Sequence, residues 1–341
     1  MLSERKKKIL CAVVDSYIET ASPISSKDIQ ENHLRDCSSA TIRNELSALE
    51  SMGYLVQPHV SAGRVPSQKA FRIYVDELMH REPLTVAEVD MIDRYFAQKW
   101  SDVEDVISAV AKVISEVTHY TSVVVKEDLS DCIKVIKLLD LSNGQMLVVI
   151  VTDSRLLKDA VIDLPQNFTS EMLVQAENWL NKIFVGRHIS DFINFRYPYA
   201  LVNSQFEQFN ALFKKIIDVL KKVSLANGMD VVTEGSNNIF NHTEYKDVNN
   251  ARCFLSTLEH KGELARIFTD TDDDNLAIKI GSEDSVPEGC SVVSAKINLG
   301  ENVSGNFGVI GPVRMNYSKV VAVLDRISEL LTDMLNPKEQ Q

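Results

Sequence analysis

One segment of the chain, residues 38–53 (SSATIRNELSALESMG), combines a helical pattern with side chains that could read DNA bases. Ile42, Leu46 and Leu49 recur at the i, i+4 and i+7 spacing of one buried helix stripe. In the major groove, Arg pairs with guanine O6 and N7, Asn pairs with adenine N6 and N7, and small apolar groups contact the thymine methyl. The predicted DNA contacts of this helix are Ser39, Ala40, Thr41, Arg43, Asn44 and Ser47.

Two further helices are predicted before this segment, at spacings typical of a helix-turn-helix. Apolar residues at helical spacing place the first at about residues 3–20. Ser25 and Asp28 have the capping-box spacing at the start of the second, which ends near Asn32. Ser38 is predicted to cap the third helix, and Gly53 is predicted to end it in the left-handed conformation.

A short hairpin is predicted directly after the third helix. Residues 54–57 (YLVQ) and 64–66 (RVP) read as strands on either side of a loop. His59 and Arg64 lie where a wing meets a phosphate or the minor groove, so both are predicted DNA contacts. Any solvated helix face can also carry Arg and Asn, so it is the order helix–helix–helix–hairpin that favours a winged helix-turn-helix.

Beyond residue 81 the pattern predicts an α+β domain interrupted by a helix-rich insert. Two helices, capped by Thr85 with Glu88 and by Ser101 with Glu104, precede four strands rich in Val and Ile. Three more strands and a final helix lie near the other end of the chain. The predicted division is residues 1–81 for the winged helix, 85–164 and 232–341 for the two parts of the α+β domain, and 165–231 for the insert.

The insert is rich in aromatic side chains. Residues 184–213 contain 8 aromatics in 30 positions, against 7% in the whole chain. A small helical core and a self-association surface both explain this enrichment, and aromatic anchors dominate the energetics of interfaces. The residues predicted to carry dimerisation are Phe206, Phe209 and Phe213.

Composition excludes several kinds of site. The five cysteines form no close pair and the seven histidines show no metal-ligand spacing, so no disulfide framework and no metal site is predicted. The apolar run at residues 9–14 imitates a signal peptide but ends at Asp15, and no later run is long enough to span a bilayer. The acidic run at residues 270–274 is predicted to be a solvated loop. We therefore expect a cytoplasmic protein that is no enzyme, needs no cofactor and has no membrane partner.

Charge is distributed unevenly along the chain. Of 36 Lys and Arg and 48 Asp and Glu in total, residues 1–81 carry 11 and 10, so the acidic excess lies outside the predicted winged helix. A domain of balanced charge gains little from attraction to phosphates. Specific binding is therefore predicted to need two copies of the domain.

Four segments resemble the HrcA family of bacterial heat-inducible transcription repressors. They are residues 38–46 (SSATIRNEL), 61–67 (SAGRVPS), 71–78 (FRIYVDEL) and 308–318 (GVIGPVRMNYS). The resemblance spans nearly the whole chain, and its departures are conservative: Leu46, Val65, Val313 and Asn316 stand where many members have Met, Ile, Thr and Asp.

This resemblance implies a GAF-like identity for the α+β domain and dimerisation through the insert. It also implies a homodimeric repressor that binds an inverted-repeat operator of the CIRCE type upstream of chaperonin operons. The GroEL chaperonin is the implied partner that helps the repressor reach its active form.

An alternative function is a small-molecule sensor, in which a ligand in the GAF-like domain controls the winged helix. A sensor pocket requires polar groups that converge inside an apolar cleft. The late strands consist mostly of Val, Ile, Ala and Ser, so this pocket is predicted to be filled and the repressor function is favoured.

Overall fold

The computed structural model describes most of the chain. Contacts divide the chain into two compact units, which are described separately. The first unit contains Met1–Val125, Val231–Ile297 and Asn306–Gln341, and the second contains Lys126–Asp230 and Asn298–Gly305. The described residues are 2–59, 62–98, 100, 102–128, 132–141, 144–153, 157–163, 169–188, 210–227, 229–269, 276–281, 283, 286–300 and 303–335.

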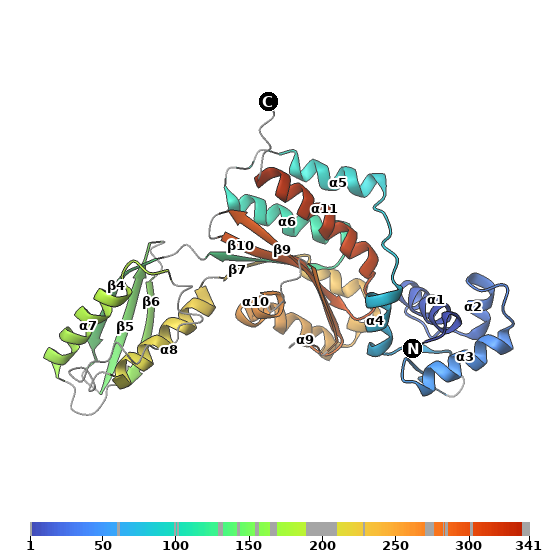
Figure 1. The fold of residues 1–341 in the computed structure, drawn as a ribbon, viewed down its shortest axis with the longest axis horizontal. Coiled ribbons are helices and arrows are strands. Elements are labelled where there is room, and N and C mark those ends of the chain that lie inside the picture. Colours follow the sequence, from blue (N-terminus) through green and yellow to red (C-terminus); the bar gives the residue numbers. More distant parts are fainter. Residues whose placement is uncertain are drawn as a thin grey trace. The chain divides into compact units, whose positions relative to one another are not determined.

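The first unit begins with a winged helix (Figure 1). Each helix starts where a hydroxyl can accept a backbone N–H: Ser25 forms a complete capping box with Asp28, and Ser38 Oγ accepts from Thr41 N at 3.1 Å. Gly53 has φ of 78°, as the predicted helix end requires. The elements are α1 (Glu4–Thr20), α2 (Ser26–Asn32), α3 (Ser39–Ser51), β1 (Leu55–Val56) and β2 (Val65–Pro66).

The helix that follows the hairpin is short and changes its winding along its length. It consists of α4 (Gln68–Ile73) and a π-helical turn, η1 (Tyr74–Leu78). The wide turn is closed by Met79 N, which donates to Tyr74 O at 2.7 Å. Tyr74 is anchored in turn by its hydroxyl, which donates to Asp15 of α1 at 2.7 Å.

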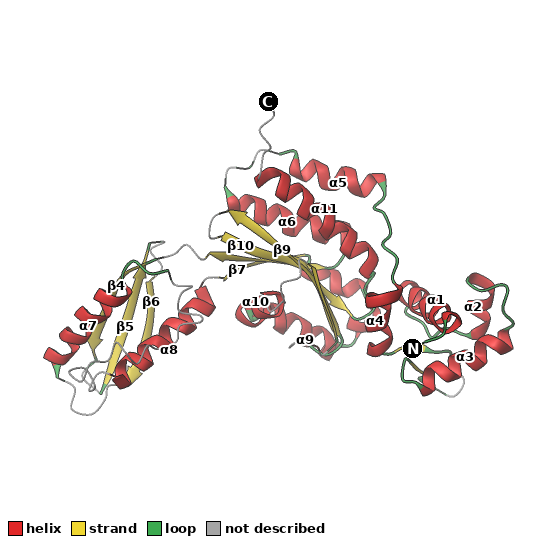
Figure 2. Cartoon of the chain, viewed as in Figure 1, coloured by secondary structure: helices red, strands yellow, loops and turns green. Residues whose placement is uncertain are grey.

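A five-stranded sheet forms the centre of the first unit, in the order β7-β3-β10-β9-β8. Figure 2 shows α6 and α11 along one face of this sheet and α9 and α10 on the other. The sequence prediction for the cap of α6 was wrong: Asp102 Oδ1, next to the predicted Ser101, accepts from Asp105 N at 2.9 Å. The elements are α5 (Val86–Phe96), α6 (Val103–Thr118), β3 (Thr121–Asp128), β7 (Met229–Glu234), η5 (Ser236–Asn241), η6 (Thr243–Lys246), α9 (Val248–Glu259), α10 (Lys261–Thr269), β8 (Leu276–Ile280), β9 (Cys290–Gly300), β10 (Val303–Pro312) and α11 (Tyr317–Leu335).

The second unit is an antiparallel three-stranded sheet with two helices. Its strands β4 (Ile133–Asp140), β5 (Gln145–Thr152) and β6 (Leu157–Asp163) pair in the order β4-β5-β6. The helices α7 (Ser170–Phe184) and α8 (Asn210–Asn227) share one hydrophobic core with these strands.

This grouping differs from the predicted division at residue 165. Residues of β4 and β5 such as Ile136 and Val148 are fully buried against α7 and α8, so these strands belong with the helices in space. The physical reason is that α7 and α8 each carry an apolar stripe that needs a sheet to cover, and β4–β6 provide it.

Candidate nucleic-acid interface

Helix α3 presents the side chains that were expected to read DNA. Ile42 and Leu49 are fully buried, which turns the opposite face of the helix outward. Arg43, Asn44 and Ser47 are exposed there. These three side chains lie on one accessible face, as the helical spacing predicted.

The remaining predicted contacts at the start of α3 are placed differently from one another. Ala40 is exposed, whereas Ser39 and Thr41 are half-buried. Ser39 Oγ lies 3.1 Å from Ser26 Oγ, and Thr41 Oγ1 lies 2.9 Å from Ser38 Oγ. Both hydroxyls therefore make hydrogen bonds within the helix-turn-helix.

The three charged residues of α3 have different surroundings. Glu45 Oε2 lies 2.7 Å from Lys6 Nζ of α1, and Glu50 Oε2 lies 2.8 Å from Arg64 Nη2 of the wing. Arg43 makes no ion pair with any residue that the structure describes. The acids of α3 are therefore compensated within the domain, whereas its arginine has no acidic partner in the described part of the chain.

The two predicted wing residues also differ. His59 is exposed at the tip of the hairpin loop. Arg64 has only 16% of its side chain exposed, because it pairs with Glu50. Sequence reasoning missed Glu50, although a carboxylate at the C-terminal end of a helix beside an arginine-bearing hairpin could have signalled the pair.

A polar cleft of about 380 Å³ lies between α3, the start of α2 and the wing. It brings Arg43 and Ser47 of α3 to the same space as Ser25, Ser26, Gln57 and Arg64. Hydroxyl, amide and guanidinium donors suit a sugar–phosphate backbone, whose oxygens are acceptors.

One of the three predicted dimerisation residues, Phe213, is described by the structure and lies in the second unit. Phe206 and Phe209 lie outside the described residues. Phe213 is 4% exposed, and its ring is stacked at 5.6 Å from the ring of Trp179. The structure therefore corrects the expectation of a surface anchor at Phe213, because α8 turns this ring toward the core that it shares with α7.

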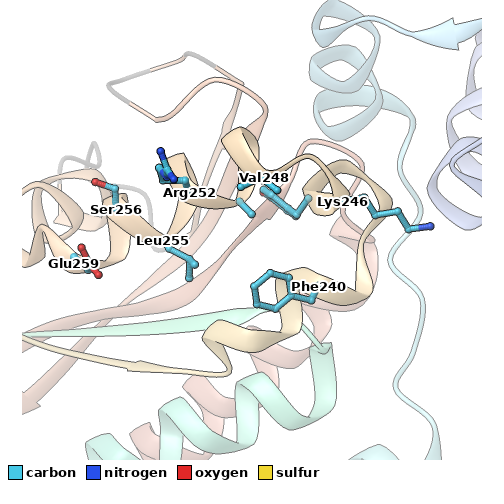
Figure 3. Close-up of a pocket in the computed structure, with 9 residues that line it drawn as sticks. Phe240, Lys246, Val248, Arg252, Leu255, Ser256 and Glu259 are labelled. Atoms are coloured by element: carbon cyan, nitrogen blue, oxygen red, sulfur yellow. The ribbon is translucent and has the colours of Figure 1, made fainter.

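An open hollow of about 660 Å³ beside α9 bears on the alternative sensor function. Its lining includes the apolar side chains of Phe240, Val248 and Leu255. Figure 3 shows the charged ends of Lys246 and Arg252 extending away from Phe240. The polar groups of the lining do not converge as a small-ligand site requires, so the hollow gives the sensor function no support.

The described residues offer no disulfide and no metal site. None of the five cysteines forms a disulfide, and no cluster of three or more His, Cys, Asp or Glu among the described residues could hold a metal ion. Within the same residues, no helix combines the length and the apolar character that crossing a membrane requires.

Comparisons with known proteins decide the family. A model of the winged helix-turn-helix transcription repressor, HrcA DNA-binding domain, matches residues 1–78, and one of the HrcA protein C-terminal domain matches residues 104–321. The chain belongs to the HrcA family. It is a DNA-binding transcription repressor, and α1–α3 with β1 and β2 form its winged-helix DNA-binding domain.

Relatives named heat-inducible transcription repressor HrcA match over nearly their full length. The one from Ruminiclostridium cellulolyticum is 35% identical and covers 96% of this chain and 95% of its own. The one from Clostridium tetani is 36% identical and covers 97% and 96%. A crystal structure of a hypothetical protein has the same fold, with a TM-score of 0.57 at 21% identity over 98% of this chain and 99% of its own.

Proposed function

We propose that this repressor silences chaperone operons by binding, as a homodimer, an inverted-repeat operator upstream of the chaperonin genes. The observation that carries the proposal is the outer face of α3, where Arg43 has no ion-pair partner among the described residues and Asn44 is exposed beside it. An arginine fork and an amide on one helix face discriminate bases in the major groove. Ser39, Ala40, Thr41 and Ser47 flank them, and His59 lies at the wing tip.

A second copy is needed because the domain has balanced charge and the operator has a two-fold axis. The symmetry of an inverted repeat is matched when two protomers are related by a two-fold axis. We assign that symmetry to the insert, residues 165–231, together with β4–β6, with which its helices share a core. A repressor of this kind acts where the operator DNA is, which places it in the cytoplasm.

The chaperonin enters the proposal through folding. The central sheet of the first unit joins β3 with β10, two strands far apart in the sequence. Non-local strand pairing is slow, and intermediates of large chains expose apolar surface. GroEL is therefore proposed to raise the fraction of chains that reach the operator-binding dimer, and heat lowers that fraction by occupying GroEL with other clients.

The experiment is footprinting and titration of the repressor on the region upstream of the host's chaperonin operon. Arg43→Ala is expected to weaken binding by about 1–3 kcal/mol and to relax specificity at one base pair in each half-site, and Asn44→Ala to act at a neighbouring pair. Arg43→Lys is the matched control, because it keeps the charge and removes the fork. If both alanine variants bind the intact repeat as tightly as the parent, α3 is not the reading helix.

The chaperonin step has its own test. Repressor unfolded in denaturant and diluted is expected to regain more operator binding with GroEL and ATP than without. Equal recovery in both conditions would remove GroEL from the proposal and leave the operator assignment unaffected.

A further inference from the structure

The ion pair between Glu50 and Arg64 joins two parts of the DNA-binding domain. Glu50 lies in the last turn of α3, and Arg64 directly precedes β2 of the wing. Their side-chain atoms Oε2 and Nη2 are 2.8 Å apart, and only 34% and 16% of the two side chains are exposed. A half-buried pair at this distance fixes the position of the hairpin relative to the recognition helix.

The backbone around Arg64 is fixed from the other side. Arg64 N donates to Ile24 O at 2.8 Å, and Ile24 N donates to Arg64 O at 2.9 Å. The preceding residue must be glycine, because a Cβ at Gly63 would overlap the carbonyl group of Ile24 and lie 2.8 Å from its nitrogen. The wing is therefore held at Arg64 between α3 and the segment that leads into α2.

This geometry changes the expected role of Arg64. A guanidinium already compensated by Glu50 adds little net attraction for a phosphate. It does, however, set the separation of α3 and the wing, and those two elements line the polar cleft that contains Arg43 and Ser47.

We propose that Glu50 and Arg64 are positioning residues that hold the wing at the distance from α3 at which both can engage the operator. The inference rests on the proposed reading of the operator by α3. It assigns the effect of Arg64 on DNA binding to the ion pair, here named the α3–wing tether, instead of to a phosphate contact.

The two roles predict opposite effects of removing the Glu50 charge. Glu50→Gln takes a negative charge away from a DNA-binding surface and releases Arg64. If Arg64 serves as a phosphate contact, this change tightens binding. If the tether positions the wing, the same change weakens operator binding, by about fivefold.

The experiment measures binding of the full-length repressor to the inverted repeat and to a random-sequence duplex, at several salt concentrations. Glu45→Gln is the matched control, because it removes the same charge from the same helix but its partner, Lys6, lies on α1. Hydrogen exchange of the Ile24 and Arg64 amides reports the wing contact directly. The charge-swapped double variant Glu50→Arg with Arg64→Glu restores the pair with reversed polarity.

The tether requires four results. Glu50→Gln binds the repeat more weakly than Glu45→Gln, with an unchanged salt slope; its Ile24 and Arg64 amides exchange faster; Arg64→Ala behaves in the same way; and the swapped variant recovers affinity and protection. The proposal is overturned if Glu50→Gln binds as tightly as the parent or tighter. It is also overturned if Arg64→Ala lowers the salt slope by about one per half-site.

The outcome is separable from that of the proposed function. If the parent does not prefer the repeat to the random duplex, the operator assignment fails. Hydrogen exchange in the four variants and the salt slope on random duplex still decide the tether, because neither measurement needs a specific site. A variant that loses its helical circular dichroism is replaced by Arg64→Lys, which keeps a cation within reach of Glu50 and is expected to retain most of the protection.

Discussion

Replacing Gly308 by alanine is expected to destabilise the sheet of the first unit. Gly308 lies in β10, which is flanked by β3 and β9. An added Cβ would overlap the carbonyl oxygen of Val293 and lie 2.7 Å from Ser294 Cα, both of which belong to the backbone of β9. β9 has no room to yield, because Val292 and Val293 are fully buried.

The cost follows from this crowding. Overpacking a tight site costs about 1–3 kcal/mol. Separating β9 from β10 also weakens one or two ladder hydrogen bonds, at about 1 kcal/mol each. We therefore expect the free energy of unfolding of this unit to fall by about 3 kcal/mol, which lowers its melting temperature by about 6–12 °C for a unit of this size.

The assay is differential scanning calorimetry, accompanied by operator binding as a function of temperature. Gly262→Ala is the control, because no heavy atom lies within 4 Å of the added Cβ and the site is in helix α10. Alanine there is expected to leave the transition unchanged or to raise it slightly. The reasoning is refuted if the first-unit transition of Gly308→Ala falls within about 1 °C of the parent.

Three further outcomes are expected. Phe213→Ala should lower the free energy of unfolding of the second unit by about 3–5 kcal/mol and change the fluorescence of Trp179. An unchanged melting temperature of this unit in calorimetry would contradict the burial of the ring. The hydrogen bond from Lys319, with a smaller contribution from the bonds to Thr85, holds the pKa of Glu88 at about 2. The carboxylate therefore contributes its full stabilisation above the ordinary carboxyl pKa, and this contribution is lost as pH falls toward 2. In an acid titration Glu88→Gln should lack this loss of stability, and curves parallel to those of the parent would contradict the assignment. Arg314→Ala removes the bond to the Ile18 carbonyl of α1, so amides at the C-terminal end of α1 should exchange faster, and unchanged exchange would show that this bond does not hold the helix.

Features set by near neighbours in the sequence could be predicted. The capping boxes at Ser25 and Thr85 and the outward face of α3 depend on residues within one or two helical turns. Ser101 and Asp102 are adjacent and have equivalent capping chemistry, so the pattern could not choose between them. The π-helical turn at Tyr74 could not be predicted from local sequence, because the Tyr74 hydroxyl donates a hydrogen bond to Asp15, which is 59 residues away.

Features that depend on distant contacts could not be predicted. Arg64 looks like a free cation in the sequence, since Glu50 meets it only when the hairpin folds back on α3. An aromatic-rich segment predicts anchors, but it does not tell whether Phe213 faces Trp179 or a partner. The same limitation applies to β4–β6, which share a core with α7 and α8, because the sequence of an amphipathic strand does not indicate which helices will cover it.

The order of strands in the central sheet has a consequence for the timing of synthesis. The core of the winged helix comes from residues contiguous in the sequence, whereas β10, which pairs with β3, is among the last elements made. At about 5–20 residues per second, roughly 10–50 s of translation separate the end of the DNA-binding domain from the end of β10. During that interval each new chain has a complete winged helix but no completed central sheet. Finished first units therefore lag behind finished winged helices by this time at every round of synthesis.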